Sequence, residues 1–174
     1  MIIQKLKQLE KESIERGIPI LGSEKGKWLL EKVKELKPKN ILELGTANGY
    51  SGIILSSAGA KLTTIELNRK IVEEAKRNFA KFEVNAKIII GDAAEIIDKL
   101  EDKYDLIFLD FEKNKYINVL DGCVKILNKN GRIIADNIFF DGCSNYRKEV
   151  LSNKKFKTEI IYLEDGLSIT RLSS

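Results

Sequence analysis

Five short apolar runs recur along the chain, and each is followed by a stretch with helical periodicity. The runs are NILEL (40–44), KLTTIEL (61–67), AKIII (86–90), YDLIFLD (104–110) and GRIIAD (131–136). Residues 68–82, for example, place Ile71, Ala75 and Phe79 on one helix face. Asn68 is expected to cap this helix. Continuously apolar strands that alternate with helices are typical of a doubly wound α/β fold with a buried parallel sheet.

Both ends of the chain depart from this alternation. Residues 2–16 and 23–36 show helical periodicity, and the second stretch is expected to begin with Ser23 as its N-cap and to end before Pro38. Near the other end, KFKTEIIYLE and LSITRL flank Asp165-Gly166 and predict a β-hairpin whose last strand runs antiparallel to the rest. We expect a single domain over residues 1–174, with N-terminal helices in 1–36 and the core in 39–174.

A mostly parallel, seven-stranded, Rossmann-like sheet with a C-terminal antiparallel hairpin resembles the class I methyltransferase fold more than a nucleotide dehydrogenase. Composition agrees with a globular protein, because hydrophobic residues make up 43% and charged residues 32% of the 174 positions. No apolar run approaches the roughly 20 residues of a membrane span, so we expect a cytoplasmic protein with no membrane partner. The chain has no histidine, and its two cysteines lack CxxC spacing, so zinc is not expected.

The net charge of +4 leaves two kinds of partner open. A basic chain can attract nucleic acid. However, the lysines alternate with glutamates along most of the chain, which is typical of solvated helix faces. A basic stripe beside the substrate crevice would favour RNA, whereas scattered lysines favour a small molecule.

The segment ILELGTANGYSG (41–52) is the first candidate binding element, because ligands of open parallel sheets bind outside the carboxyl ends of the strands. Gly45 and Gly49 have GxxxG spacing rather than the GxGxxG of dinucleotide-binding proteins, and such glycines are often only turn residues. Glu43 is more informative. An adjacent carboxylate would repel a pyrophosphate but attract the ammonium and sulfonium groups of S-adenosylmethionine.

Two further acidic residues follow the next strands. Glu66 lies 21 residues after Gly45 and could accept hydrogen bonds from both hydroxyls of a ribose. It could equally be an ordinary charged residue at a strand end. Asp92 could bond an adenine amino group, cap the helix that follows, or do both.

Oxygen-bearing side chains end the last two parallel strands. Asp110 ends the fourth strand, and Asp136 and Asn137 end the fifth. If these strands are neighbours, the three side chains converge and supply the hard oxygen donors that magnesium takes. Lys113 lies one helical turn after Asp110 and could take a proton from a substrate hydroxyl. Taken singly, the two carboxylates are equally compatible with structural roles, and Lys113 with a surface position.

Most of these residues lie in six segments that follow one another along the chain: ELGTANGYS, TTIELN, GDAAEII, YDLIFLDFEKNKY, GRIIADN and DGLSITRL. Together they resemble the successive motifs of the metal-dependent O-methyltransferases, the family of catechol and caffeoyl-CoA O-methyltransferases, from about residue 21 to residue 172. The resemblance implies that eight residues border S-adenosylmethionine: Leu21, Glu43, Gly45, Ser51, Glu66, Asp92, Ala93 and Asp110. It also implies three ligands of Mg²⁺ or another divalent cation: Asp110, Asp136 and Asn137.

The resemblance assigns individual roles as well. Glu43 and Gly45 would border the methionine end of the cofactor, and Ser51 would contact its carboxylate. Lys113 would be the catalytic base. Glu159 would be the candidate to contact a second substrate hydroxyl, because catechol enzymes place a glutamate shortly before the terminal DGL.

The leading hypothesis is therefore an S-adenosylmethionine-dependent O-methyltransferase that transfers a methyl group to a hydroxyl of a small, catechol-like acceptor with Mg²⁺ assistance. A transfer RNA hydroxyuridine O-methyltransferase of the same family is the alternative. A nicotinamide-dependent oxidoreductase and a non-catalytic cofactor-binding module are further alternatives. Family members usually have longer acceptor-side segments than this chain. We therefore expect an acceptor site that is either open or completed by a neighbouring subunit of a homo-oligomer.

Overall fold

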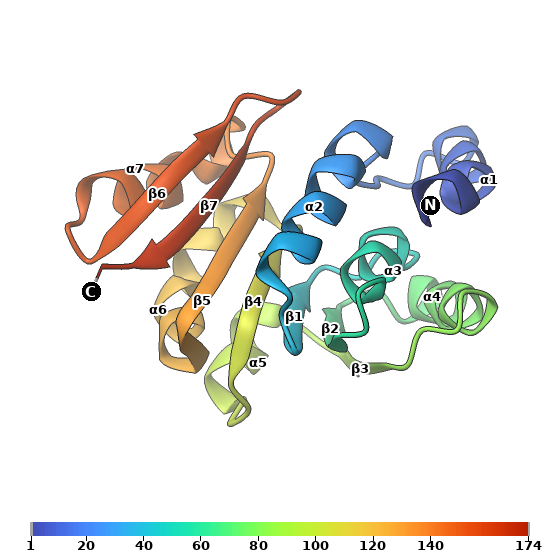
Figure 1. Cartoon of the computed structure of the whole chain (residues 1–174), viewed down its shortest axis with the longest axis horizontal. Helices are drawn as coiled ribbons and strands as arrows, with labels where there is room; N and C mark the ends of the chain where they lie inside the picture. Colours follow the sequence, from blue (N-terminus) through green and yellow to red (C-terminus); the bar gives the residue numbers. More distant parts are fainter. Residues whose placement is uncertain (1, 174) are drawn as a thin grey trace.

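The computed structural model describes residues 2–173 and contains one seven-stranded sheet between two layers of helices (Figure 1). The strands are β1 (Asn40–Leu44), β2 (Lys61–Glu66), β3 (Ala86–Ile90), β4 (Tyr104–Leu109), β5 (Leu127–Asp136), β6 (Phe156–Ile161) and β7 (Leu167–Leu172). Their order in the sheet is β3-β2-β1-β4-β5-β7-β6. The pairs among β1 to β5 are parallel, and β7 is antiparallel to both β5 and β6. The predicted fold is confirmed.

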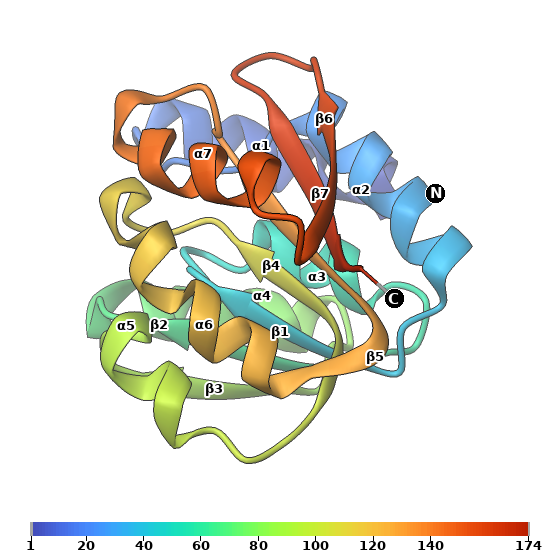
Figure 2. The same cartoon turned by 90° about the vertical axis from the view of Figure 1, so that its left-hand side faces the viewer.

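The helices divide between the two faces of the sheet. They are α1 (Ile2–Glu15), α2 (Ser23–Leu36), α3 (Tyr50–Ser56), α4 (Arg69–Lys81), α5 (Ala93–Ile96), α6 (Tyr116–Ile126) and α7 (Ser144–Ser152). Figure 2 shows α5, α6 and α7 in front of the sheet and α1 to α4 behind it. None of the helices in residues 2–173 is long and apolar enough to cross a membrane.

Alternation along the central strands explains why both faces are covered. In β4, Leu106 and Phe108 pack in the hydrophobic cluster beneath α1 to α4, whereas Ile107 and Leu109 pack in the cluster beneath α5 and α6. Successive side chains of a strand point to opposite faces, so an uninterrupted apolar run buries both sides. The carboxyl ends of β1, β2, β4 and β5 then lie at one edge of the sheet, as the crossovers of parallel strands require.

The start of α2 differs from the sequence prediction. Ser23 is the first helical residue rather than the N-cap, and Gly22 occupies the cap position without a side-chain cap. The backbone N–H of Ser23 instead donates to the Glu10 carboxylate of α1, at 2.9 Å. A side chain from another helix therefore does the capping, which local sequence patterns do not reveal.

Two other elements differ as well. β5 begins at Leu127 rather than at Gly131, since the polar residues of the LNKN segment carry no apolar strand pattern. Helix α7 was not expected. Its SNYRKEVLS sequence buries Tyr146 and Val150, one turn apart, which is too short a pattern to distinguish from a loop.

The β6–β7 hairpin reaches back to the carboxyl end of β5. Backbone N–H groups of Ile138 and Phe139 donate to the carbonyls of Gly166 and Asp165, at 3.2 and 3.1 Å. The turn before β7 is thereby fixed beside the Asp136-Asn137 pair.

Candidate active site

A cavity of about 690 Å³ opens at the carboxyl ends of the parallel strands. It brings together ten of the eleven residues predicted to bind the cofactor, bind the cation or act as the base: Leu21, Gly45, Ser51, Glu66, Asp92, Ala93, Asp110, Lys113, Asp136 and Asn137. Glu43 is the eleventh and lies behind the cavity wall. The roles of these residues stay predictions, but their convergence is a property of the fold.

Gly45 allows the turn after β1 to pass close to the backbone at the end of β4. Its φ of 101° lies in the region that favours glycine, and a Cβ at this position would collide with the backbone carbonyl of Asp110. The close approach that requires glycine is therefore to the neighbouring strand. Because Asp110 is a predicted cation ligand, a larger residue at position 45 would also displace part of the predicted cation site.

Glu43 is completely buried beneath this turn. Its carboxyl accepts hydrogen bonds from the hydroxyls of Ser51 at 2.6 Å and Thr64 at 2.7 Å. Burial raises the pKa of Glu43 to about 8, against the lowering effect of these two hydrogen bonds. Glu43 therefore reaches the cavity through Ser51, and a direct contact with the cofactor ammonium stays a prediction.

The raised pKa of Glu43 predicts a pH-dependent stability. The folded pKa of about 8 exceeds the ordinary value of 4.5, so the fold favours the protonated carboxyl. This contribution is complete below the lower value and is lost as pH rises toward the higher one, at up to about 1.4 kcal/mol per pH unit. Glu43→Gln, which cannot ionise, should remove this part of the slope in urea unfolding measured across the window. Parallel curves for Glu43→Gln, the native protein and an exposed control, Glu95→Gln, would contradict the assignment.

Glu66 and Asp92, the predicted ribose and adenine contacts, already have hydrogen-bond partners within the protein. Glu66 accepts from the backbone N–H groups of Ala47 and Asn68, both at 2.9 Å, and so ties the glycine turn to the end of β2. Asp92 caps α5 by accepting from the N–H of Ala94 and also pairs with Lys115 at 2.8 Å. The hydrogen bond from Lys115, and after it the capping bond, lower the pKa of Asp92. The predicted capping role of Asp92 is confirmed, and its adenine contact stays a prediction.

Lys113 lines the cavity shortly after the end of β4. Its Nζ donates to Asp110 Oδ1 at 2.6 Å and to the Tyr116 hydroxyl at 3.1 Å. Tyr116 is buried and donates its own proton to the carbonyl of Leu109 at 2.9 Å, so its oxygen is free to accept from Lys113. The amine is thus held at a defined position beside a predicted cation ligand.

Sequence reasoning missed Lys25 and Asp165. Lys25 is 2% exposed, and its ammonium group binds Asp136 at 2.5 Å and also Asp165. Burial alone would lower the pKa of Lys25, but the two carboxylates outweigh burial and raise it. A usable pattern existed, because Lys25 shares the buried face of α2 with Leu29 and Val33 at four-residue spacing. A lysine on a core-facing stripe requires a buried partner.

Glu159 does not occupy the position that the sequence suggested. It lies exposed on β6, paired with Ile169 of β7, and is not part of the cavity lining. Glu164 and Asp165, in the turn that follows β6, line the cavity instead. The acidic residues that the β6–β7 hairpin contributes to the cavity therefore come from its turn.

The polar side chains at the ends of β4 and β5 fit a divalent cation. Asp110 Oδ1 and Asp136 Oδ1 accept from lysines, and Asn137 Nδ2 donates to Asp165. Within residues 2–173, Oδ2 of both aspartates and Oδ1 of Asn137 take part in none of the hydrogen bonds found. Burial, and after it the Asp110 carboxylate, raise the pKa of Asp136 against the effect of Lys25. A cation shared by the two carboxylates would relieve their repulsion.

The donor set is nevertheless small. In the described part of the chain, no group of three His, Cys, Asp or Glu side chains has the arrangement of a metal site. The candidate site rests on two carboxylates and one amide. Such a set leaves several coordination positions for water or substrate oxygens, as magnesium sites commonly do.

Comparison with solved structures identifies the class of fold. A Podospora anserina methyltransferase, solved with SAH bound, superposes with a TM-score of 0.88 at 21% identity, covering 99% of this chain and 88% of that protein. A methyltransferase from Geobacter sulfurreducens has a TM-score of 0.84 at 23% identity, covering 97% and 89%. The fold is that of class I methyltransferases.

Sequence comparison identifies the family. A sequence model of the O-methyltransferase family matches residues 2–169, and the chain belongs to this family. Catechol O-methyltransferase B of Danio rerio is 30% identical over 164 residues, which cover 87% of this chain and 61% of the relative. A caffeoyl-CoA O-methyltransferase of Stellaria longipes is 28% identical over 152 residues, covering 79% and 62%. The chain thus spans about three fifths of the length of these relatives. The predicted family is confirmed.

Proposed function

We propose that this protein is an S-adenosylmethionine-dependent O-methyltransferase that acts on a small hydroxylated acceptor with the help of a divalent cation. Membership of the O-methyltransferase family supports the reaction class. The observation that carries the proposal is the charge of the cavity. Its lining contains seven carboxylates, Glu66, Asp92, Asp110, Glu112, Asp136, Glu164 and Asp165, against two lysines, Lys25 and Lys113.

An acid-lined cavity suits cationic ligands and disfavours phosphates. S-adenosylmethionine has a sulfonium and an ammonium group, and a divalent cation adds positive charge at the acceptor end. A dinucleotide would instead place its pyrophosphate among carboxylates, which costs Coulomb energy. The charge therefore supports the methyltransferase over a nicotinamide-dependent oxidoreductase.

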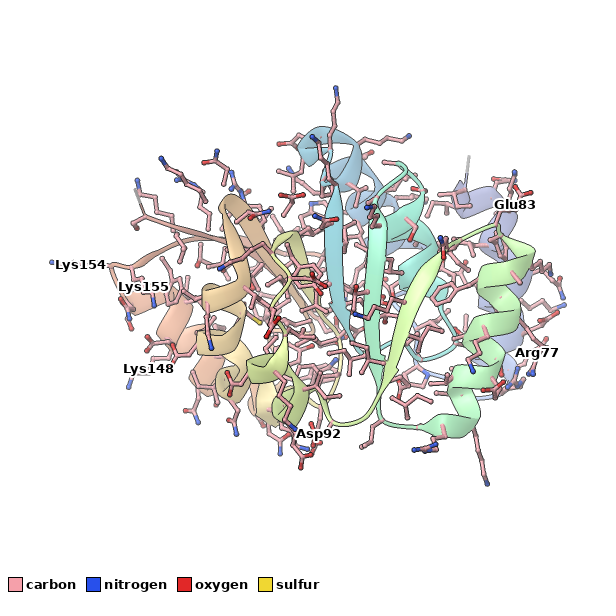
Figure 3. The ribbon with its side chains drawn as sticks, turned by 90° about the horizontal axis from the view of Figure 1, so that it is seen from below. Arg77, Glu83, Asp92, Lys148, Lys154 and Lys155 are labelled. Carbon is pink, nitrogen blue, oxygen red and sulfur yellow. The ribbon has the colours of Figure 1, made fainter. Side chains whose placement is uncertain are left out.

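The same charge favours a small acceptor over RNA. Lys148, Lys154 and Lys155 are exposed at the α7–β6 edge of the molecule, well separated from Asp92 in the view of Figure 3, and none of them lines the cavity. RNA binding requires basic side chains that neutralise phosphates beside the reaction site. The RNA alternative, the homo-oligomer and the cytoplasmic location stay predictions.

The mechanism follows from the positions of the polar side chains. S-adenosylmethionine supplies the electrophilic methyl group, and a divalent cation held by Asp110, Asp136 and Asn137 would lower the pKa of the acceptor hydroxyl. Lys113, fixed by Asp110 and Tyr116, is the base that takes the hydroxyl proton at Nζ. Glu66 and the glycine turn, at the ends of β2 and β1, hold the methyl donor S-adenosylmethionine. Much of the acceleration therefore comes from positioning the methyl group against the acceptor hydroxyl.

Cofactor choice can be measured without knowing the acceptor. Isothermal calorimetry should show binding of S-adenosylmethionine and of its demethylated product, with NAD far weaker. Equal or tighter binding of NAD would refute the methyltransferase proposal.

Glu66→Ala should weaken cofactor binding. The change removes a charged acceptor for two ribose hydroxyls and releases the N–H of Ala47, at a cost of about 1.5–3 kcal/mol, or roughly 10- to 150-fold in affinity. Calorimetry with S-adenosylmethionine measures the loss, and Glu95→Ala, an exposed acid of α5 outside the lining, is the matched control. Unchanged affinity in a folded Glu66→Ala protein would show that Glu66 only shapes the turn.

A further inference from the structure

Lys25 is the one lysine of the described chain that is almost fully buried. Its ammonium group therefore needs polar partners inside the protein. Helix α2 directs it toward the carboxyl end of β5, where it meets Asp136 and Asp165. These partners are 111 and 140 residues away in sequence, at the end of β5 and in the turn between β6 and β7. A buried ammonium group is costly unless carboxylates surround it, so the three side chains must be held together.

Asn137 closes these three side chains into a ring. Its Nδ2 donates to Asp165 Oδ2 at 2.6 Å, and its backbone N–H donates to Asp136 Oδ1 at 2.7 Å. Lys25 joins the same two aspartates from the other side. We call Lys25, Asp136, Asn137 and Asp165 the outer ring.

The outer ring determines which way the Asn137 amide points. An ionised aspartate can only accept hydrogen bonds, so the amide nitrogen of Asn137 must face Asp165. The amide oxygen is then directed away from Asp165 and remains available as a ligand for a cation. Asn137 has a φ of 55°, in the left-handed region that asparagine adopts more readily than most other non-glycine residues.

We propose that Lys25 and Asp165 are positioning residues that orient Asp136 and Asn137 as ligands of the candidate cation site. This inference rests on the proposed function, which places a divalent cation there. Lys25 and Asp165 do not ligate the cation in this account. Residues that fix the orientation of metal ligands typically change metal affinity when they are removed.

A purely structural role of the Lys25–Asp165 ion pair would have different consequences. If Lys25 only joins α2 to the hairpin turn, removing the pair lowers the free energy of unfolding and leaves cation affinity unchanged. If the outer ring orients the ligands, cation affinity falls even in protein that is fully folded.

The test is a charge-balanced double variant, Lys25→Met with Asp165→Ala. It removes one positive and one negative charge, so the net charge near Asp110, Asp136 and Asn137 stays the same. Mn²⁺ is the probe, and its binding to the protein without cofactor or acceptor is measured by electron paramagnetic resonance. We expect the double variant to bind Mn²⁺ roughly 10- to 100-fold more weakly than the native protein.

Two controls accompany this measurement. Glu73→Gln with Lys76→Met removes an exposed pair of α4 and should leave Mn²⁺ affinity unchanged. Asp136→Ala should abolish the binding, which assigns the signal to the candidate site. Circular dichroism verifies that each variant is folded.

If the double variant does not fold, Asp165→Asn provides the second measurement. Its amide oxygen can accept from Lys25 or from Asn137, but its NH₂ group cannot accept, so one bond of the outer ring is lost. Mn²⁺ affinity should fall about tenfold.

Native-like Mn²⁺ affinity in a folded variant that lacks the outer ring would overturn the positioning inference and leave the proposed function standing. A native protein that binds no Mn²⁺ would overturn the cation part of the proposed function and this inference with it.

Discussion

Lys113→Met should lower the turnover number by about 10²- to 10⁴-fold, the usual contribution of a positioned general base. Methionine fills similar space but cannot accept the hydroxyl proton. Cofactor affinity should change little, because Lys113 lies beside Asp110 and Tyr116, where the acceptor is proposed to bind. Turnover measured against pH should recover partly as pH rises, since the acceptor hydroxyl then ionises without help.

Asp136→Ala gives the contrasting pattern. It should weaken activation by Mg²⁺, and higher pH should not restore turnover, because ionisation of the acceptor does not replace a lost ligand. Lys148→Met, on the exposed face of α7, is the control for Lys113→Met. An unaffected Lys113→Met protein would show that the DFEK segment has a structural role here.

Gly45→Ala should destabilise the fold strongly. The new Cβ would collide with the backbone carbonyl of Asp110 while φ stays near 101°. We expect a loss of more than about 4 kcal/mol in the free energy of unfolding, together with loss of S-adenosylmethionine binding in any folded fraction. Urea unfolding and calorimetry measure the two effects.

Gly59→Ala separates backbone strain from collision. Gly59 has a φ of 86°, but a Cβ there would meet nothing within 4 Å. Its cost should be only the 1–2 kcal/mol or so of a left-handed residue. Equal destabilisation by the two substitutions would contradict the collision with Asp110 and the link between the glycine turn and the cation site.

Much of the fold was readable from local patterns. The apolar runs of β1, β2 and β4 are continuous because both faces of the central sheet are covered, and the Asp165-Gly166 turn identified the terminal hairpin. Helix α7 and the first residues of β5 were not predicted, because short or polar segments take their structure from tertiary packing.

Local sequence patterns likewise indicated some residues of the candidate site and not others. The convergence of Asp110, Asp136 and Asn137 was predictable because they lie at the ends of β4 and β5, and parallel strands end at the same edge of a sheet; their role as ligands stays a prediction. The burial of Glu43 was not, since its hydroxyl partner Thr64 comes from the neighbouring strand β2. Lys25 and Asp165 were missed because their contacts span more than a hundred residues, and only the folded chain brings them together.

The most direct test of the central claim follows a labelled methyl group. Protein, methyl-labelled S-adenosylmethionine and Mg²⁺ are incubated with cell extract, and the small-molecule and RNA fractions are counted separately. We expect label on a hydroxylated small molecule, with loss of transfer in chelator and in Asp136→Ala. Label confined to RNA, or undiminished transfer in chelator, would contradict the central claim.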